Sequence, residues 1–84
     1  MYDPHDFQMN PGKYVLFRTA VVARHVVTVN GMADLHAGDV VGIQYGQTGY
    51  HPLYRRLEPM YTVTRSDGTR GGYLYGSALK DFVL

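Results

Sequence analysis

Cysteine and tryptophan are both absent from the 84-residue chain, and glutamate occurs only once, at Glu58. Without cysteine there is no disulfide framework, no thiolate nucleophile and no cysteine-based zinc site, which favours a reducing compartment such as the cytoplasm. The formal charge is only +1, so an acidic nucleic-acid mimic and a strongly basic nucleic-acid wrapper are both disfavoured. Long apolar runs are also lacking. Residues 20–29 form the longest, which Arg24 and His25 interrupt and which is too short to span a membrane.

The composition that remains is typical of one small globular domain, because 45% of the residues are hydrophobic and 18% are charged. We expect this domain to cover residues 13–84. A flexible, irregular arm is expected over residues 1–12, which end in the turn signal Asn10-Pro11-Gly12. Valine, eight tyrosines and three phenylalanines supply residue types that favour strands, so we expect an all-β fold.

Alternation of apolar and polar residues predicts the first three strands. A short strand is expected over residues 14–18 and a second over residues 20–29, where one face carries Val21, Ala23, His25, Val27 and Val29. A helix is the alternative for residues 20–29, but the valines there and the turn signal Asn30-Gly31 favour a strand. Residues 39–45 predict a third strand that places Val41, Ile43 and Tyr45 on one face.

The second half of the chain predicts a long loop, a hairpin and a closing strand. Residues 46–52 are rich in turn formers, and residues 53–59 continue this loop as an exposed segment or a single helical turn. Strands over residues 60–65 and 69–75 are expected to form a tight hairpin through Ser66-Asp67-Gly68, with a bulge or bend at Gly71-Gly72. Residues 76–80 predict a 3₁₀ turn, and residues 81–84 a last short strand. Val41, Ile43, Val63 and Leu74 should share one core.

The order of these signals resembles the Src-homology-3-like small β-barrel over residues 20–84. The first segment that shows the resemblance is Leu35-His36-Ala37-Gly38-Asp39-Val40-Val41-Gly42-Ile43. It is similar to the segment where the long first loop of that fold enters its second strand. The other is Gly71-Gly72-Tyr73-Leu74-Tyr75-Gly76-Ser77-Ala78-Leu79, which is similar to the strand, 3₁₀ turn and final strand that close the barrel. The resemblance implies a small antiparallel barrel.

The residues with which the eukaryotic members of that family bind proline-rich peptides are absent. Their Ala-Leu-Tyr-Asp-Tyr run is replaced by Val21-Val22-Ala23-Arg24-His25, and their Pro-Ser-x-Tyr run by Gly76-Ser77-Ala78-Leu79. The tryptophan that opens their third strand has no counterpart in a chain without tryptophan. Recognition of proline-rich peptides is therefore not implied, and this barrel hosts many unrelated functions.

No set of residues predicts catalysis, a metal site or a cofactor. The four histidines, at positions 5, 25, 36 and 51, form no HxH or HxxxH pair, whereas a metal needs converging ligands. We expect His25 to be a hydrogen-bonded core or edge residue. Ser66 suits a hairpin tip and Ser77 an N-cap, and a single glutamate excludes a pair of catalytic glutamates. We therefore expect a protein that is not an enzyme.

The informative feature is the tyrosine and arginine content of the long loop and of the strand over residues 69–75. These residue types are enriched where proteins bind each other, so we expect a partner-binding surface made of Tyr50, His51, Tyr54, Arg55, Arg56, Tyr73 and Tyr75.

The sequence thus predicts a protein-binding module, such as a small accessory or regulatory protein or a phage-encoded inhibitor. Single-stranded nucleic acid is an alternative partner, because bases stack on aromatic rings and arginines contact phosphates. A structural subunit that forms homo-oligomers is another. A further alternative is that the tyrosines only cover a small core.

Overall fold

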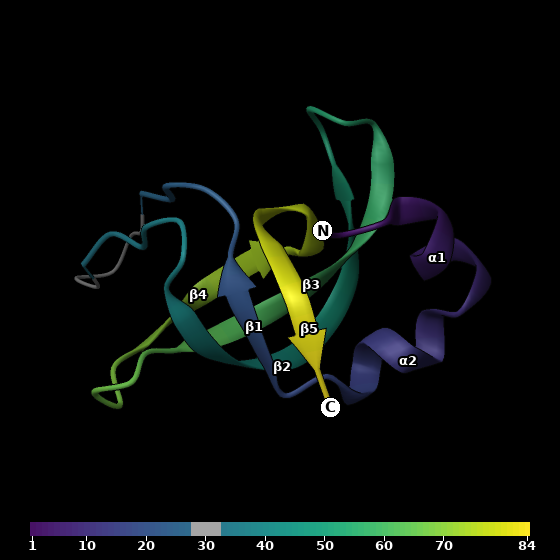
Figure 1. Cartoon of the computed structure of the whole chain (residues 1–84). Coiled ribbons are helices and arrows are strands. Elements are labelled where there is room, and N and C mark those ends of the chain that lie inside the picture. Colours follow the sequence, from purple (N-terminus) through teal and green to yellow (C-terminus); the bar gives the residue numbers. More distant parts are fainter. Residues whose placement is uncertain (28–32) are drawn as a thin grey trace.

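The computed structural model describes residues 1–27 and 33–84, and their main element is one antiparallel sheet (Figure 1). Its strands are β1 (Thr19–Val22), β2 (Val40–His51), β3 (Arg56–Thr64), β4 (Arg70–Tyr75) and β5 (Leu79–Val83), in the order β4-β3-β2-β1-β5. The short helices are α1 (Pro4–Met9), α2 (Pro11–Leu16) and the 3₁₀ turn η1 (Gly76–Ala78). The all-β class is confirmed. The sheet is not closed, because β4 and β5 form its two edges.

The long hairpin of β2 and β3 is the largest element of the sheet. The alternation of apolar and polar residues correctly predicted which side chains of this hairpin are buried near the sheet centre. Val41, Ile43 and Val63 are buried, and Ile43 pairs with Val63. The predicted loop over residues 46–59 is wrong, because β2 continues to His51 and β3 already begins at Arg56. The glycine at position 46 serves close packing rather than a turn, since a Cβ there would overlap the ring of Tyr73.

The hairpin of β3 and β4 agrees with the sequence prediction. The Arg65 backbone N–H donates to the Thr69 carbonyl at 2.8 Å, and Gly68 closes the turn with a φ of +89°. Thr62 of β3 pairs with Tyr73, and the next residue, Val63, pairs with Gly71. Gly72 is therefore the extra residue of a bulge in β4. Leu74 is buried, and the predicted 3₁₀ turn is η1.

Strand β1 is shorter than predicted and faces the other way. Ala20 and Val22 are buried, whereas Ala23, His25 and Val27 are exposed. The face predicted to be apolar is therefore the outer one, a shift of one residue that reverses every side chain. Val29 and the predicted turn at residues 30–31 lie outside the described residues. Beyond β1, Val26 forms an isolated bridge with Leu35.

The N-terminal segment is helical and packed against the sheet. Asp3 caps α1 by accepting the His5 backbone N–H at 2.9 Å, and prolines begin both helices. The predictions of an irregular arm over residues 1–12 and of a strand over residues 14–18 are therefore wrong. No helix in the two described stretches is long and apolar enough to cross a membrane.

Two hydrophobic clusters meet under the helices. The larger cluster lies against the sheet and is made of Ala20, Val22, Leu35, Val41, Ile43, Tyr61, Val63, Leu74, Ala78 and Leu79. The smaller one consists of Tyr2, Phe7 and Tyr14, and Phe17 and Phe82 pack against both. The fully buried Tyr61 joins them, because its hydroxyl donates to the Tyr14 carbonyl at 2.7 Å. The helices therefore complete the core.

Candidate functional site

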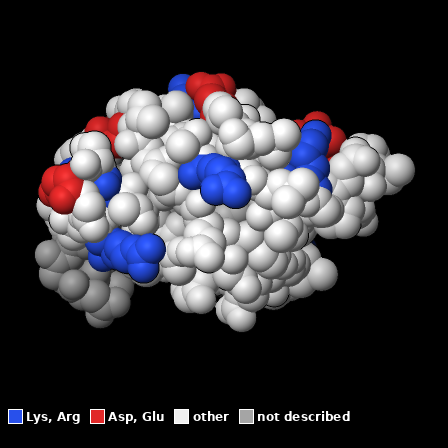
Figure 2. Space-filling model, turned by 90° about the horizontal axis from the view of Figure 1, so that it is seen from below, with Lys and Arg blue, Asp and Glu red and all other residues white. Residues whose placement is uncertain are grey.

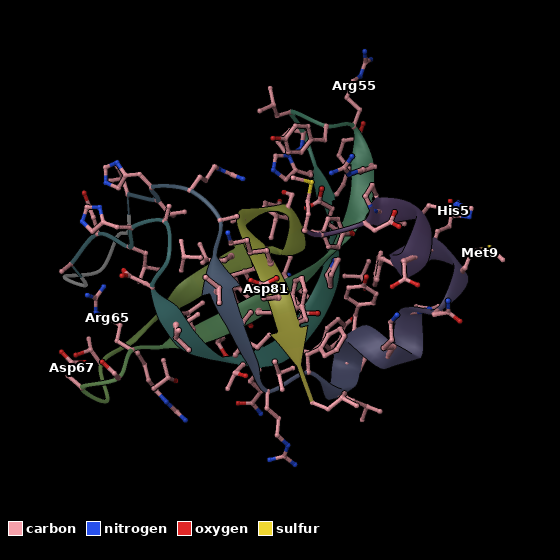
Figure 3. All side chains as sticks on the ribbon, in the orientation of Figure 1. His5, Met9, Arg55, Arg65, Asp67 and Asp81 are labelled. Carbon is pink, nitrogen blue, oxygen red and sulfur yellow. The ribbon has the colours of Figure 1, made fainter. Side chains whose placement is uncertain are left out.

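The turn of the long hairpin is built around His51. Its Nδ1 accepts the backbone N–H groups of Leu53, at 3.2 Å, and Tyr54, at 3.4 Å, and its carbonyl accepts from Arg55 N at 2.7 Å. His51 is only 8% exposed. It therefore shapes the turn from beneath, whereas Arg55 points away from the molecule at the tip (Figure 3).

A row of rings and one cation runs from β4 across the hairpin end to the N-terminal segment. The His51 ring lies 4.3 Å from the ring of Tyr75 and 4.7 Å from that of Tyr54. The Arg56 guanidinium follows, 4.7 Å from the Tyr54 ring and 5.9 Å from the Tyr2 ring. Five side chains from three segments of the chain thus form one continuous row of contacts, which we call the aromatic ladder.

The exposed tyrosines fall on two sides of the hairpin. Tyr54 is 45% exposed, and Tyr73 is 51% exposed on the same face of β4 as Tyr75. Tyr50 is also exposed, but it neighbours His51 in β2 and pairs with Leu57, so it points to the opposite face. Of the residues expected to bind a partner, the structure brings together Tyr54, Arg56, Tyr73 and Tyr75, with Arg55 at the tip.

A buried carboxylate, which the sequence analysis placed in an exposed segment, lies under the ladder. Glu58 is 0% exposed. Its Oε2 accepts from Arg56 Nε at 2.7 Å, and its Oε1 accepts from the backbone N–H of Ser77 at 3.1 Å. Since a buried charge is tolerated only when it is paired, Glu58 ties the hairpin to η1 and fixes the Arg56 guanidinium.

A cleft of about 410 Å³ opens beside this ion pair, between the N-terminal segment, the hairpin end and β5. We call it the hydroxyl cleft; it is lined by Met1, Tyr2, Ala23, Tyr54, Arg56, Ser77, Leu79 and Lys80. The hydroxyls of Tyr2 and Ser77 are buried and find no hydrogen-bond partner among the described residues. Burial, followed by the charge of Glu58, raises the pKa of Tyr2 well above its usual value, so its hydroxyl keeps its proton. No sequence signal pointed to Tyr2.

The sequence suggested four separate histidines, but two of them lie together in the structure. His25 and His36 stack at 4.8 Å with their planes 8° apart, and His25 Nε2 lies 3.0 Å from Asp34 Oδ2. His25 is therefore an exposed, paired side chain rather than a core residue. His5 lies on α1 and points outward (Figure 3). Within residues 1–27 and 33–84 no three ligand-type side chains converge as a metal site.

The charges on one face of the molecule are dispersed. On the face shown in Figure 2, the Lys and Arg side chains stand apart among uncharged residues, and several lie beside acidic ones. This face does not offer the continuous basic track that a phosphate backbone would follow.

Comparison with models of protein families, with curated proteins and with solved structures finds no match to this chain. Any assignment of function therefore rests on the aromatic ladder, the cleft and the charges described above.

Proposed function

We propose that the protein is a non-catalytic protein-binding module that binds its partner through the tyrosine face, a surface made of Tyr54, Arg55, Arg56, Tyr73 and Tyr75. The aromatic ladder is the observation that carries this proposal. Tyrosine and arginine bring large contact area and several hydrogen-bond donors to protein interfaces, and are enriched among residues that dominate binding energy.

The tyrosine face is held in place before any partner arrives. The Tyr75 hydroxyl donates to the Tyr50 carbonyl at 3.0 Å, and Tyr54 lies between the His51 ring and the Arg56 guanidinium. Side chains that are already fixed lose little conformational entropy on binding. This preorganisation supports a binding role over the alternative that the tyrosines only cover the core.

A non-catalytic role is part of the same proposal. The Nδ1 of His51 already accepts two backbone N–H groups, and Ser66 lies in the turn between β3 and β4. Neither arrangement pairs a nucleophile with a base. An accessory or regulatory protein, such as a phage-encoded inhibitor, and a cytoplasmic location in keeping with the lack of cysteine complete the proposal.

We further propose that the sheet is related to the Src-homology-3-like small barrel. Support comes from the antiparallel order β4-β3-β2-β1-β5 and from the 3₁₀ turn η1 directly before β5. In that arrangement the tyrosine face lies at one end of the sheet, where the long hairpin projects beyond its neighbours (Figure 1).

The test is capture of a partner from the native host with the tagged protein, followed by mass spectrometry. The double variant Tyr54→Ala/Tyr73→Ala should lose the partner, whereas the matched control Tyr50→Ala, an equally exposed tyrosine on the other face of the hairpin, should retain it. If the control loses the partner and the double variant keeps it, the tyrosine face is not the site.

Binding of a labelled oligonucleotide at two salt concentrations separates the alternatives. Affinity that falls steeply at the higher salt would support a nucleic-acid partner instead. A mass in solution that doubles with concentration, and returns to the monomer in Tyr54→Ala/Tyr73→Ala, would support a homo-oligomer.

A further inference from the structure

A second groove, separate from the hydroxyl cleft, lies between the end of α2 and the outer face of the sheet. Its volume is about 520 Å³. Gly42 of β2 pairs with Thr19 of β1 on one side and with Thr64 of β3 on the other. Thr64 pairs in turn with Arg70 of β4. Because Val41, the neighbour of Gly42, is buried in the core, this row of four residues points away from the core.

Gly42 leaves the middle of this row without a side chain. A Cβ at this position would lie 3.6 Å from the Thr64 carbonyl oxygen and 3.7 Å from the Thr64 Cβ, which are ordinary contact distances. The backbone of Gly42 is also not in the left-handed region. Neither packing nor backbone conformation therefore requires glycine here. Glycine inside a strand lowers stability and often marks a place where a ligand approaches the backbone closely.

Two arginines without partners stand at the two sides of the groove. Arg18 directly precedes β1, and Arg70 begins β4. Both side chains are exposed, and neither forms an ion pair or hydrogen bond with another described residue. None of the described residues that line the groove is acidic. Asp67, in the adjoining turn, accepts the Thr69 backbone N–H at 2.9 Å. The groove, which we call the arginine groove, thus carries positive charge that the fold does not neutralise.

The wall formed by α2 is apolar and fixed to the sheet. Val15 is 48% exposed and Leu16 is 64% exposed. The Arg18 backbone N–H donates to the Val83 carbonyl at 2.8 Å, and the Arg18 carbonyl accepts from the Ile43 N–H at 2.8 Å. Exposed aliphatic side chains next to unpaired cations suit a ligand that is both apolar and acidic.

We propose that the arginine groove binds an extended acidic segment of another protein, with an apolar side chain over Gly42 and a carboxylate at each arginine. In the order β4-β3-β2-β1, the strand of Arg70 and the strand that Arg18 precedes are three strand spacings apart, roughly 14 Å. In an extended segment, the residues two positions before and after a central residue share its face and lie ~13 Å apart. The pattern acidic-x-apolar-x-acidic therefore fits the groove.

A protein segment fits this groove better than a nucleic acid. Two arginines provide few phosphate contacts, whereas each guanidinium can hold a carboxylate through two hydrogen bonds. Among the described lining residues, the one aromatic side chain is Phe17, which is partly buried and packed on the rings of Tyr14 and Phe82. It is not a free surface for base stacking. The groove shares no residue with the tyrosine face, so this inference does not rest on the proposed function.

The experiment is a titration of the ¹⁵N-labelled full chain with a synthetic heptapeptide of serines that carries leucine at its centre and glutamate two positions to either side. The amides of Gly42, Thr64 and Arg70 should show saturable shifts. A peptide of the same composition with the glutamates directly beside the leucine, where they point to the other face, should bind at least about threefold more weakly. A peptide with lysine in place of glutamate should not bind.

Variants test the two features of the groove separately. Gly42→Val fills the space over the glycine, so it should abolish the shifts of the Thr64 and Arg70 amides. Its melting temperature should be at least that of the wild type, because valine favours strands. Arg18→Gln and Arg70→Gln should each weaken peptide binding about three- to fivefold. The matched control Arg55→Gln, at the tip of the long hairpin, should bind the peptide as the wild type does.

Each other outcome would overturn the inference. Shifts of these amides with single-stranded oligothymidine but not with the acidic peptide would assign the groove to nucleic acid. Without saturable shifts from either probe, the groove is not a binding site. If Gly42→Val and both arginine variants bind the peptide as tightly as the wild type does, the peptide binds elsewhere.

The tyrosine variants separate this inference from the proposed function. Tyr54→Ala/Tyr73→Ala should bind the acidic peptide as the wild type does, because neither residue lines the groove. Weaker binding would place the peptide on the tyrosine face and overturn the inference. Whether the same double variant loses the captured partner tests the proposed function alone.

Discussion

At the scale of single residues, Glu58 and Arg56 connect stability to the candidate site. Arg56 is one of the residues that the sequence predicted to bind a partner, and its side chain is 34% exposed, but its Nε also neutralises a carboxylate that is 0% exposed. A change at Arg56 should therefore affect folding as well as the proposed binding, so it is a poor probe of binding on its own.

Removing the arginine should leave the Glu58 carboxylate buried without its cation. We expect Arg56→Ala to lower the free energy of unfolding by about 2 kcal/mol, less than the loss for a fully buried pair because the guanidinium is partly solvated. Urea unfolding measures this. Adding Glu58→Gln should restore part of the loss, since the uncharged amide needs no cation; if the double variant is less stable than Arg56→Ala, the ion pair is not the cause.

Arg55 occupies a backbone conformation that suits glycine. Its φ is +56° at the tip of the hairpin, in the left-handed region where a Cβ is strained. Arg55→Gly should therefore raise the free energy of unfolding by about 0.5–1 kcal/mol, whereas Arg55→Ala should leave it unchanged. Equal melting temperatures for the two variants would show that the turn is not strained.

At the scale of elements, helices α1 and α2 are a structural part of the protein. They bury Tyr2, Phe7 and Tyr14 against Phe17 and Phe82, with ring centroids of Phe7 and Tyr14 5.3 Å apart. The aromatic cluster covers one end of the sheet core through the bond from Tyr61 to Tyr14. The segment thus contributes to both the core and the hydroxyl cleft.

Deletion of residues 1–11 should strongly destabilise the protein. It removes the Tyr2 and Phe7 rings, each of which contributes about 1.5–3 kcal/mol by burial. It also exposes the ring of Tyr14, which both of them contact. We expect the melting temperature to fall by more than about 12 °C. Phe7→Ala should also lower the melting temperature, because the Phe7 ring is buried. The matched control Met9→Ala should leave the melting temperature nearly unchanged, because Met9 is 67% exposed. An unchanged melting temperature after the deletion would show that the arm is not part of the core.

Asp6 ties the two helices together in a pH-dependent way. The Lys13 ammonium, 2.6 Å away, and the Tyr14 hydroxyl, at 2.7 Å, lower the pKa of Asp6 from 3.8 to about 2. Because the folded pKa is the lower one, the stabilisation is complete above about pH 4 and is lost as the pH falls towards 2. Asp6→Asn should therefore be less stable than the wild type at pH 5, and the difference should shrink as the pH falls and disappear below about pH 2. A stability difference that stays constant over this range would contradict the interaction.

The strands were easier to predict than the helices for physical reasons. Period two is visible in the first half of β2, and the turn residues at 66–68 mark the next hairpin, so these two parts were predicted. Helices of six residues are too short to show a 3.6-residue period, and the signal that was present, Asp3 followed by Pro4, is a start signal only. Gly46 and Gly49 suggested a loop, although they serve to accommodate Tyr73 and Met60 inside a long hairpin.

At the scale of the whole molecule, the two edges of the sheet are interrupted. The bulge at Gly72 breaks the regular pairing of β4, and Asp81 in β5 has a φ of +51°. Bulges and charges on edge strands discourage pairing with further chains. A partner that adds a strand to either edge is therefore disfavoured, which leaves side-chain surfaces such as the tyrosine face for binding.

The candidate site was partly predictable from the sequence. Residue type and loop position pointed to Tyr54, Arg55 and Arg56, and alternation around the buried Leu74 placed Tyr73 and Tyr75 outward. Contacts between segments far apart in the chain bury His51 and Glu58 and place the Tyr2 ring beside Arg56. No local sequence pattern encodes such contacts.

The central claim is that the tyrosine face binds a protein, and the affinity of a captured partner for Tyr54→Ala tests it most directly. We expect a loss of about 1–3 kcal/mol in binding free energy, with a melting temperature close to that of the wild type, because Tyr54 is 45% exposed. Titration calorimetry and thermal unfolding measure the two quantities on the same samples. A variant that binds the partner as tightly as the wild type does, but melts at a much lower temperature, would contradict the claim and assign Tyr54 to the fold alone.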